Sequence, residues 1–158
     1  MKSIIIFLSF VILVFACGGE NNNSSNEAKP QAAKPVKKID DGKGVGPVTF
    51  VKLNSPLDPE MVKKGKAIYE MKCAACHKLT NKRVVGPGWK GVTKKRKPEW
   101  IMNMTTNVEE MLAKDKTAKE LLKECLVRMP NQNLSTEDAR EVLEFMFSID
   151  GQEVAKNK

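Results

Sequence analysis

Histidine is nearly absent from this sequence: His77 is the single one among 158 residues. Cysteine is scarce as well, and of the four cysteines only Cys73 and Cys76 lie close together. A structural zinc site usually takes four cysteine and histidine ligands in two spaced pairs, so these counts argue against one. The single histidine also excludes a metal centre that takes two histidine ligands from the same chain.

The N-terminal apolar run is too short to cross a membrane. It extends from Ile4 to Ala16, 13 apolar or small residues, whereas a membrane-spanning helix needs about 20. Lys2 precedes it, and a short apolar stretch behind a positive charge is typical of an export signal. An uncleaved membrane anchor is the alternative interpretation.

The end of this run, Val14-Phe15-Ala16-Cys17, resembles a bacterial lipoprotein signal. The resemblance implies removal of residues 1–16, acylation of Cys17 and a lipid anchor in a membrane. Phe15 departs from the small residue that is usual at its position, and an ordinary secretory peptide with an incidental cysteine is the alternative. Either signal exports the chain. We therefore expect it at the periplasmic face of a bacterial membrane, anchored by the lipid.

Basic residues outnumber acidic ones, 27 to 19, which gives a formal net charge of +8. Much of the excess lies at Lys82-Arg83 and between Lys90 and Lys97. Such a run is commonly just a solvated face, but a basic surface can also steer an acidic redox partner. Nucleic-acid binding is not expected, because this exported chain has no recognition motif.

Composition divides the chain into segments. Residues 17–43 begin with the lipidated cysteine and continue with Asn, Ser, Lys, Ala and Pro, which predicts a flexible tether. Residues 44–57 alternate in part and are expected to form an extended arm on the domain that follows. That domain spans residues 58–150, and residues 151–158 are expected to be a disordered tail.

The domain opens with a clear helix-start signal, because Asp58 is a suitable N-cap and Pro59 a suitable first residue. This helix is expected to run to about Cys73. Gly65 lies inside it, where glycine costs stability relative to alanine, so we expect another helix to approach closely there. Residues 78–97 are punctuated by glycine and proline and indicate a loop.

Further helices follow in the second half of the domain. Pro98 begins one that ends near Asn107, residues 108–114 form a short helical turn, residues 117–127 form another helix, and Ser135 begins the last. No strand pattern is evident, so the predicted fold is all-α with about four helices. A chain of this length builds only a thin core, and a buried cofactor would supply the missing apolar mass.

Cys73-Ala74-Ala75-Cys76-His77 has the C-x-x-C-H spacing of a c-type haem attachment site. The two thiols become thioethers on the haem vinyl groups, and the adjacent imidazole reaches the iron from one side. Redox dithiols and halves of zinc sites also contain C-x-x-C. A thioredoxin-like dithiol is expected within a β-α-β unit, whereas the sequence around this motif has a helical pattern. The predicted cofactor is one covalent haem c per chain, with His77 as an iron ligand.

The sixth iron position is left to a methionine, a lysine, the amino terminus or water. Methionines at helical spacing are core filler by default. Met129 differs, because it follows a predicted helix and precedes Pro130, on a loop from which a side chain can be presented across the haem face. Met129 is therefore the candidate ligand.

With these segments in this order, residues 58–149 resemble class I monohaem cytochromes c. The likeness rests on the C-x-x-C-H motif, on the Gly-Pro segment at Val85–Val92, in which Trp89 replaces a usual leucine, on Met129-Pro130, and on Leu134–Ala139 with the helix after it. The resemblance implies the cytochrome c fold, wrapped around one covalent haem.

The resemblance also implies roles for individual residues. His77 and Met129 would be the axial iron ligands, and Gly86 and Pro130 would belong to the haem pocket. The carbonyl of Pro87 would accept the second imidazole proton and fix the orientation of the ring.

Trp89 or Trp100 would donate its indole N–H to a haem propionate. Gly65 and Tyr69 would form the contact between the first and last helices. Cys125 is left over, and we expect it to be buried core on an apolar helix face, with an intermolecular disulfide as the alternative.

Iron with two protein ligands has no open position for a substrate, so we expect an electron carrier and not an enzyme. The alternative is a haem-based peroxidase or small-gas sensor whose sixth ligand is labile or absent. The expected partners are exported redox proteins: a respiratory reductase, an oxidase or a quinol-oxidising complex, of which the domain could also be a module. The chain is expected to be monomeric.

Overall fold

The structure is a computed structural model that describes residues 40–125 and 127–156. The predicted signal peptide, Cys17 and the predicted tether as far as residue 39 lie outside these residues. Within the described part, no helix is long and apolar enough to cross a membrane.

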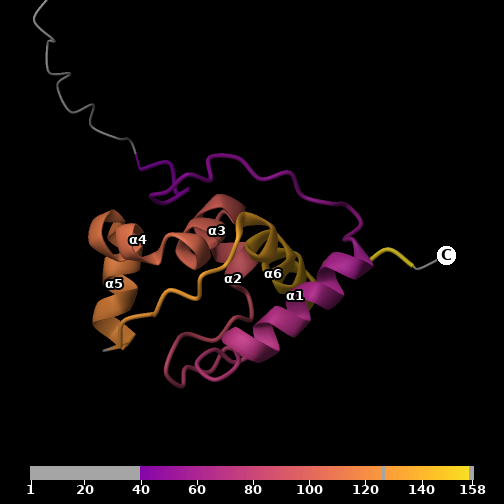
Figure 1. Cartoon of the computed structure of the whole chain (residues 1–158). Helices are drawn as coiled ribbons and strands as arrows, with labels where there is room; N and C mark the ends of the chain where they lie inside the picture. Colours follow the sequence, from indigo (N-terminus) through magenta and orange to yellow (C-terminus); the bar gives the residue numbers. More distant parts are fainter. Residues whose placement is uncertain (1–39, 126, 157–158) are drawn as a thin grey trace, which may run out of the picture. The chain divides into compact units, whose positions relative to one another are not determined.

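Six helices and no strand, apart from one isolated bridge, make up the described part of the chain, which confirms the all-α prediction (Figure 1). The helices are α1 Pro59–Lys72, α2 Val92–Lys95, α3 Pro98–Thr106, α4 Val108–Lys114, α5 Lys116–Cys125 and α6 Thr136–Ile149. Two of them differ from the sequence-based expectation. The short helix α2 lies inside the predicted loop 78–97, and α5 ends two residues before the predicted end.

Helix α1 begins as its first residues predict. The Asp58 carboxylate accepts two backbone N–H bonds of the first turn, at 2.8 and 3.1 Å, and Pro59 follows as the first helical residue. These bonds satisfy donors that have no partner inside the helix. The helix ends at Lys72 with Cys73 as its C-cap, so the C-x-x-C-H motif starts where the helix stops.

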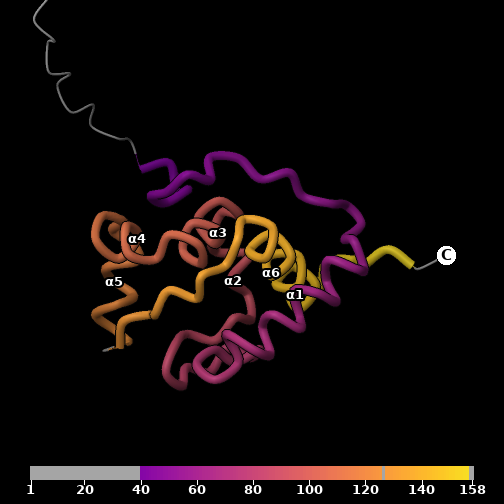
Figure 2. Tube along the Cα trace, viewed as in Figure 1, coloured from indigo at the N-terminus to yellow at the C-terminus, as the bar shows by residue number. Residues whose placement is uncertain are grey.

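Helices α1 and α6 pack against each other and lie next to each other in Figure 2. A Cβ atom on Gly65 would lie 2.0 Å from the carbonyl oxygen of Glu141, so the backbones can come this close only with glycine. Nearby, the rings of Tyr69 and Phe145 pack with centroids 5.5 Å apart. The predicted contact through Gly65 and Tyr69 is confirmed.

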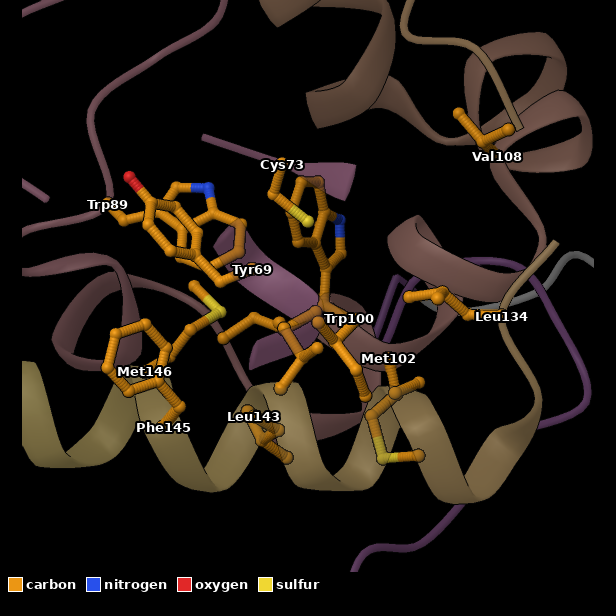
Figure 3. Packing of buried hydrophobic residues seen from close by; sticks show 14 of the residues in the cluster. Tyr69, Cys73, Trp89, Trp100, Met102, Val108, Leu134, Leu143, Phe145 and Met146 are labelled. Atoms are coloured by element: carbon orange, nitrogen blue, oxygen red, sulfur yellow. The ribbon is translucent and has the colours of Figure 1, made fainter. Parts of the chain in front are cut away.

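Helix α6 has a reciprocal cap at its start and an apolar face along its length. The backbone N–H of Asp138 donates to Ser135 Oγ at 3.0 Å, and the N–H of Ser135 donates to an Asp138 carboxylate oxygen at 3.0 Å. The buried face comprises Val142, Leu143, Phe145 and Met146, and Figure 3 shows the last three within the core.

The end of α6 holds α2 in place. The Asp150 carboxylate accepts hydrogen bonds from the Gly91 N–H and from both the N–H and the hydroxyl of Thr93. Burial opposes ionisation of Asp150, but these hydrogen bonds outweigh it and keep the pKa of the carboxyl below its ordinary value. A residue at the far end of the domain thus supplies the cap that α2 lacks locally.

Residues 40–56 form an arm that lies on α3 and α4. Asn103 of α3, only 1% exposed, donates to the carbonyls of Lys43 and Val48 at 3.1 and 2.9 Å and accepts from the Val48 N–H at 3.1 Å. A Cβ atom on Gly46 would lie 2.2 Å from the Asn103 amide oxygen. The predicted arm is therefore present, and it already includes Lys43, which the composition assigned to the tether.

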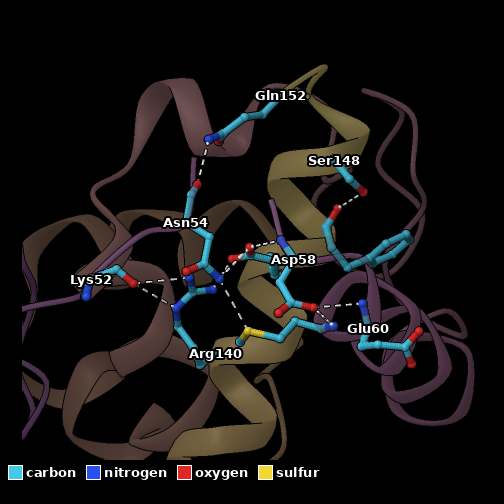
Figure 4. Close-up of polar contacts among 10 residues, drawn as sticks. Lys52, Asn54, Asp58, Glu60, Arg140, Ser148 and Gln152 are labelled. Atoms are coloured by element: carbon cyan, nitrogen blue, oxygen red, sulfur yellow. Dashed lines mark hydrogen bonds and ion pairs between the residues drawn. The ribbon is translucent and has the colours of Figure 1, made fainter. Parts of the chain in front are cut away.

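A fully buried carboxylate ties the end of the arm to α1 and α6 (Figure 4). Glu144 accepts hydrogen bonds from Asn54 Nδ2 at 3.0 Å and from the Asp58 N–H at 2.9 Å, and it pairs with Arg140. Arg140 also donates to the carbonyl of Lys52 at 3.2 and 3.1 Å. The buried charge is thus paired and hydrogen-bonded, the condition under which proteins tolerate one.

Part of the predicted disordered tail instead pairs with Leu57, the residue that follows the arm. The Leu57 N–H donates to the carbonyl of Glu153 at 2.8 Å, and the Ala155 N–H donates to the carbonyl of Leu57 at 2.9 Å. Leu57 is fully buried. Backbone pairing of this kind leaves no mark in the composition from which the tail was predicted.

Candidate functional site

A cavity of about 400 Å³ collects the predicted site residues. It is lined by residues from all six helices, from the loop after α1 and from the segment between α5 and α6, and most of its lining is apolar. Cofactor sites typically measure about 300–1,000 Å³. Every predicted site residue that the structure describes lines this cavity: Cys73, Cys76, His77, Gly86, Pro87, Trp89, Trp100, Met129 and Pro130.

The C-x-x-C-H motif forms a tight turn on the cavity wall. The N–H groups of Cys76 and His77 donate to the Cys73 carbonyl at 3.1 and 2.9 Å, and Tyr69 Oη donates to the His77 carbonyl at 2.8 Å. Both motif cysteines therefore reach the same cavity, as the spacing predicts. Burial raises the pKa of the Cys73 thiol to about 11.

These properties do not fit the rival sites. The attacking cysteine of a redox dithiol has a lowered pKa, whereas that of Cys73 is raised. Among residues 40–125 and 127–156, no group of three or more histidine, cysteine, aspartate or glutamate side chains could hold a metal ion. Two thiols and one imidazole on an apolar wall instead fit a covalently held haem.

The His77 ring is fixed by the loop that follows the motif. Its Nδ1 atom lies 2.9 Å from the carbonyl oxygen of Pro87, which confirms the expected hydrogen bond. A carbonyl only accepts, so Nδ1 donates the proton and Nε2 keeps the lone pair that can bind iron. Burial lowers the pKa of His77, and the Pro87 hydrogen bond opposes this only in part, so the ring is neutral at neutral pH.

Gly86 lets the loop lie directly against this ring. A Cβ atom on Gly86 would be 2.5 Å from His77 Cε1 and 2.8 Å from Nδ1. Trp89 of the same loop packs nearby, with its ring centroid 4.9 Å from that of Tyr69 and 5.6 Å from that of His77. The tryptophan that replaces a leucine is thus accommodated by tilted ring contacts, and Figure 3 shows Trp89 and Tyr69 next to each other.

Met129 reaches the same cavity from the segment between α5 and α6. It is half-buried, lines the cavity and packs against the core cluster. Pro130 follows it on the lining, and neither residue belongs to a helix. The fold therefore brings His77 and Met129 together as the sequence predicts. Cys17, the predicted lipidation site, lies outside the described residues.

Trp100 lies on the cavity as predicted, and its indole N–H has a partner within the protein. It lines the cavity and is 6% exposed, but its indole N–H donates to Asp115 Oδ1 at 3.1 Å. Either Trp89 or Trp100 was expected to donate to a haem propionate, and in this structure the proton of Trp100 goes to a protein carboxylate. The face of the ring carries Arg96 instead, with the guanidinium carbon 5.2 Å from the ring centroid.

Cys125 also differs from the expectation. It is half-buried and lines the cavity, and Arg83 Nη1 donates to its sulfur at 3.0 Å. Arg83 comes from the loop after the motif, far from Cys125 in sequence. The sulfur thus has a polar neighbour and is not part of the buried apolar core, and it forms no disulfide with Cys73 or Cys76.

The charged residues on the cavity lining all have one sign. Six cationic side chains line it, and no aspartate or glutamate of residues 40–125 and 127–156 does. The sequence pointed to the basic run between 82 and 97 but not to its neighbours from other segments. The six are Lys72, Arg83, Lys90, Lys95, Arg96 and Arg128. This charge suits a cofactor with carboxylate groups such as haem.

Comparison with known proteins agrees with this site. The sequence profile of the cytochrome c family matches residues 62–150. Cytochrome c from Rhodothermus marinus is a similar solved structure, with 34% identity and a TM-score of 0.64 over 66% of this chain and 90% of that one. An engineered form of it, Rma TDE, has 33% identity and a TM-score of 0.64, with the same coverage of both chains.

The same engineered protein is also similar in a structure described as bound to a carbene intermediate, at 33% identity and a TM-score of 0.61, again over 66% of this chain and 90% of that one. A search of curated proteins gave no match.

Proposed function

This chain belongs to the cytochrome c family, and from that premise we propose that it passes single electrons between exported redox partners. Membership of this family implies a covalently bound haem c and haem-based electron transfer. When bound, the haem supplies a one-electron couple between ferrous and ferric iron. The chain's own residues supply the attachment, the axial ligands and the surroundings.

One observation carries the proposal: the C-x-x-C-H turn and Met129 line the same cavity. Cys73 and Cys76 would hold the haem covalently, His77 Nε2 would ligate the iron, and Met129 Sδ would take the remaining position. With both axial positions filled by protein, no position is left for a substrate. This favours electron transfer over the peroxidase or gas-sensor alternative.

The neighbouring groups have supporting roles. The carbonyl of Pro87 holds the His77 ring in one orientation and increases its basicity as a ligand. The apolar lining would keep water from a bound haem iron, and burial of this kind is one of the means by which proteins set a haem potential. The cationic lining would favour an acidic partner protein at the cavity rim.

The membrane attachment is proposed from the sequence. Cys17 would carry the lipid at the periplasmic face, and the residues that follow would link it to the arm. Cys17→Ser should release the mature chain into the soluble periplasmic fraction. A variant that still sediments with membranes at high salt would contradict lipid anchoring.

As a monomer, the exported domain would exchange electrons with a respiratory reductase, an oxidase or a quinol-oxidising complex.

The ligand proposal is tested with Met129→Ala in the haem-loaded protein. Met71→Ala is the matched control, since Met71 is 75% exposed. We expect the wild type and the control to show six-coordinate low-spin spectra and weak carbon monoxide binding. Met129→Ala should lose the methionine–iron absorption and bind carbon monoxide tightly. A five-coordinate wild type would overturn the proposal and favour the sensor or peroxidase alternative.

A further inference from the structure

Trp100 separates the cavity from a buried carboxylate. Its ring lines the cavity, while its indole N–H donates to Asp115 Oδ1 at 3.1 Å. Asp115 lies between α4 and α5 and is only 6% exposed. Neither the proposed haem attachment nor the electron-transfer role uses this carboxylate.

The same carboxylate oxygen also holds the start of α5. The Ala118 N–H donates to Asp115 Oδ1 at 2.7 Å, so Asp115 caps this helix. Four residues of α5 line the cavity, and the chain then continues to Met129. The four are Ala118, Leu121, Leu122 and Cys125. One oxygen atom thus links the cavity wall at Trp100 to the helix that leads to the proposed iron ligand.

The arm fixes Trp100 from the side of the N–H group. A Cβ atom on Gly44 would be 3.0 Å from Trp100 Cδ1, the atom bonded to the indole nitrogen, and 2.7 Å from the Met111 thioether. The Val45 N–H donates to that Met111 sulfur at 3.0 Å. The arm therefore lies so close to this edge of the indole that there is no room for a side chain at Gly44.

The other polar ties of α5 and of the segment after it are exposed. Arg83 pairs with Glu124, whose side chain is 60% exposed, and Arg128 pairs with Glu109, which is also 60% exposed. Exposed ion pairs contribute little to stability. A buried hydrogen bond to a charged group contributes more, because breaking it leaves a buried carboxylate without its partner.

We propose that Asp115 is a positioning residue for the sixth iron ligand. Acting through Trp100 and α5, it holds the segment that carries Met129 against the cavity. The proposal rests on ligation of the iron by Met129. When the Asp115 link is broken, α5 can move away from Trp100, and Met129 would spend a larger fraction of time away from the iron.

The experiment compares Asp115→Ala with Asp115→Asn in haem-loaded protein. Carbon monoxide, the probe, binds ferrous iron only when the methionine is displaced, so its apparent affinity rises with the methionine-free fraction. Loss of the two hydrogen bonds that Trp100 and Ala118 donate to Asp115 should raise the apparent affinity of Asp115→Ala about tenfold or more. Asp115→Asn keeps an acceptor oxygen for both donors and should remain near the wild type. The methionine–iron absorption should weaken in the alanine variant alone.

Two controls separate positioning from general instability. Val142→Ala opens a gap in the core of α6 at a fully buried residue that does not line the cavity. It should lower the unfolding temperature without changing carbon monoxide affinity. If Asp115→Ala does not fold, Asp115→Ser takes its place. Serine retains a cap for α5 but cannot reach Trp100, so the apparent carbon monoxide affinity of this variant should also rise.

The outcomes distinguish this inference from the ligand assignment. If Met129→Ala raises carbon monoxide affinity but the Asp115 variants match the wild type, the positioning role is overturned and ligation by Met129 stands. If Met129→Ala leaves the affinity unchanged, the ligand assignment itself fails. If Val142→Ala raises the affinity as much as Asp115→Ala, the effect is one of stability and the inference is wrong.

Discussion

The Nδ1 atom of His77 donates a hydrogen bond to the carbonyl oxygen of Pro87 across 2.9 Å. This contact joins the end of the C-x-x-C-H motif to the loop before α2. The loop comes this close because Gly86, which precedes the proline, has no side chain to meet the ring. Orientation of the imidazole is thus decided by backbone packing, and changes to the loop should be visible at the iron.

Gly86→Ala should disturb the haem spectrum and destabilise the protein. Its Cβ atom would lie 2.5 Å from His77 Cε1, and such overpacking typically costs about 1–3 kcal/mol. Absorption spectroscopy, redox titration and thermal unfolding of the haem-loaded variant check this. Gly65→Ala is the control, because its clash with Glu141 should lower stability and leave the spectrum unchanged. Equal spectral changes in both variants would contradict a specific role for Gly86.

Asp150→Asn should destabilise the protein at neutral pH but not in acid. The pKa of Asp150 is lowered in the folded state, so its stabilising effect is present above the unfolded-state pKa of about 3.9 and is lost as the pH falls through the folded-state value. Unfolding free energies measured from pH 7 downward should therefore converge for wild type and variant. Exposed Glu120→Gln serves as control. A difference that persists unchanged in strong acid would refute the assignment.

Arg96→Gln should lower the reduction potential. The guanidinium stacks on Trp100 and lines the cavity, and a nearby cation favours the ferrous state, which carries less positive charge. Lys94→Gln removes the same charge from an exposed position of α2 that does not line the cavity, so its effect should be smaller and easily screened by salt. Redox titration at low and high ionic strength checks this, and equal shifts for the two variants would argue against it.

Asn103→Ala should release the arm. The variant loses three hydrogen bonds to the backbone of Lys43 and Val48, and buried backbone groups left without partners cost about 1–3 kcal/mol each. Hydrogen exchange at the Val48 amide should accelerate, and proteases should cut within residues 43–49. Asn81→Ala, at an exposed asparagine of the loop, should leave both readouts at the wild-type level. Unchanged exchange in Asn103→Ala would mean that other contacts hold the arm.

Features that depend only on residues close together in the chain could be predicted from the sequence. Asp58-Pro59 and the Ser135 capping box start helices α1 and α6 through contacts within one turn. The motif cysteines and His77 are neighbours, so their common cavity follows from local geometry. Met129 was found because a methionine before a proline, after a predicted helix, lies on a loop.

Features that depend on distant partners could not be predicted. Helix α2 is capped by Asp150, which lies beyond α6. The indole N–H of Trp100 donates to Asp115, and Arg83 donates to the sulfur of Cys125. In each case the partner is chosen by tertiary packing, which local sequence patterns do not encode.

The order of contacts along the arm has a mechanical consequence. Tension on the chain preceding residue 40 would first load the Asn103 clamp on Lys43 and Val48, then the Glu144 network at Asn54, and only afterwards the backbone pairing at Leu57. The C-x-x-C-H turn lies beyond all three in the chain. Pulling at the proposed membrane attachment would thus load the arm before any strain reached His77, the proposed iron ligand in that turn.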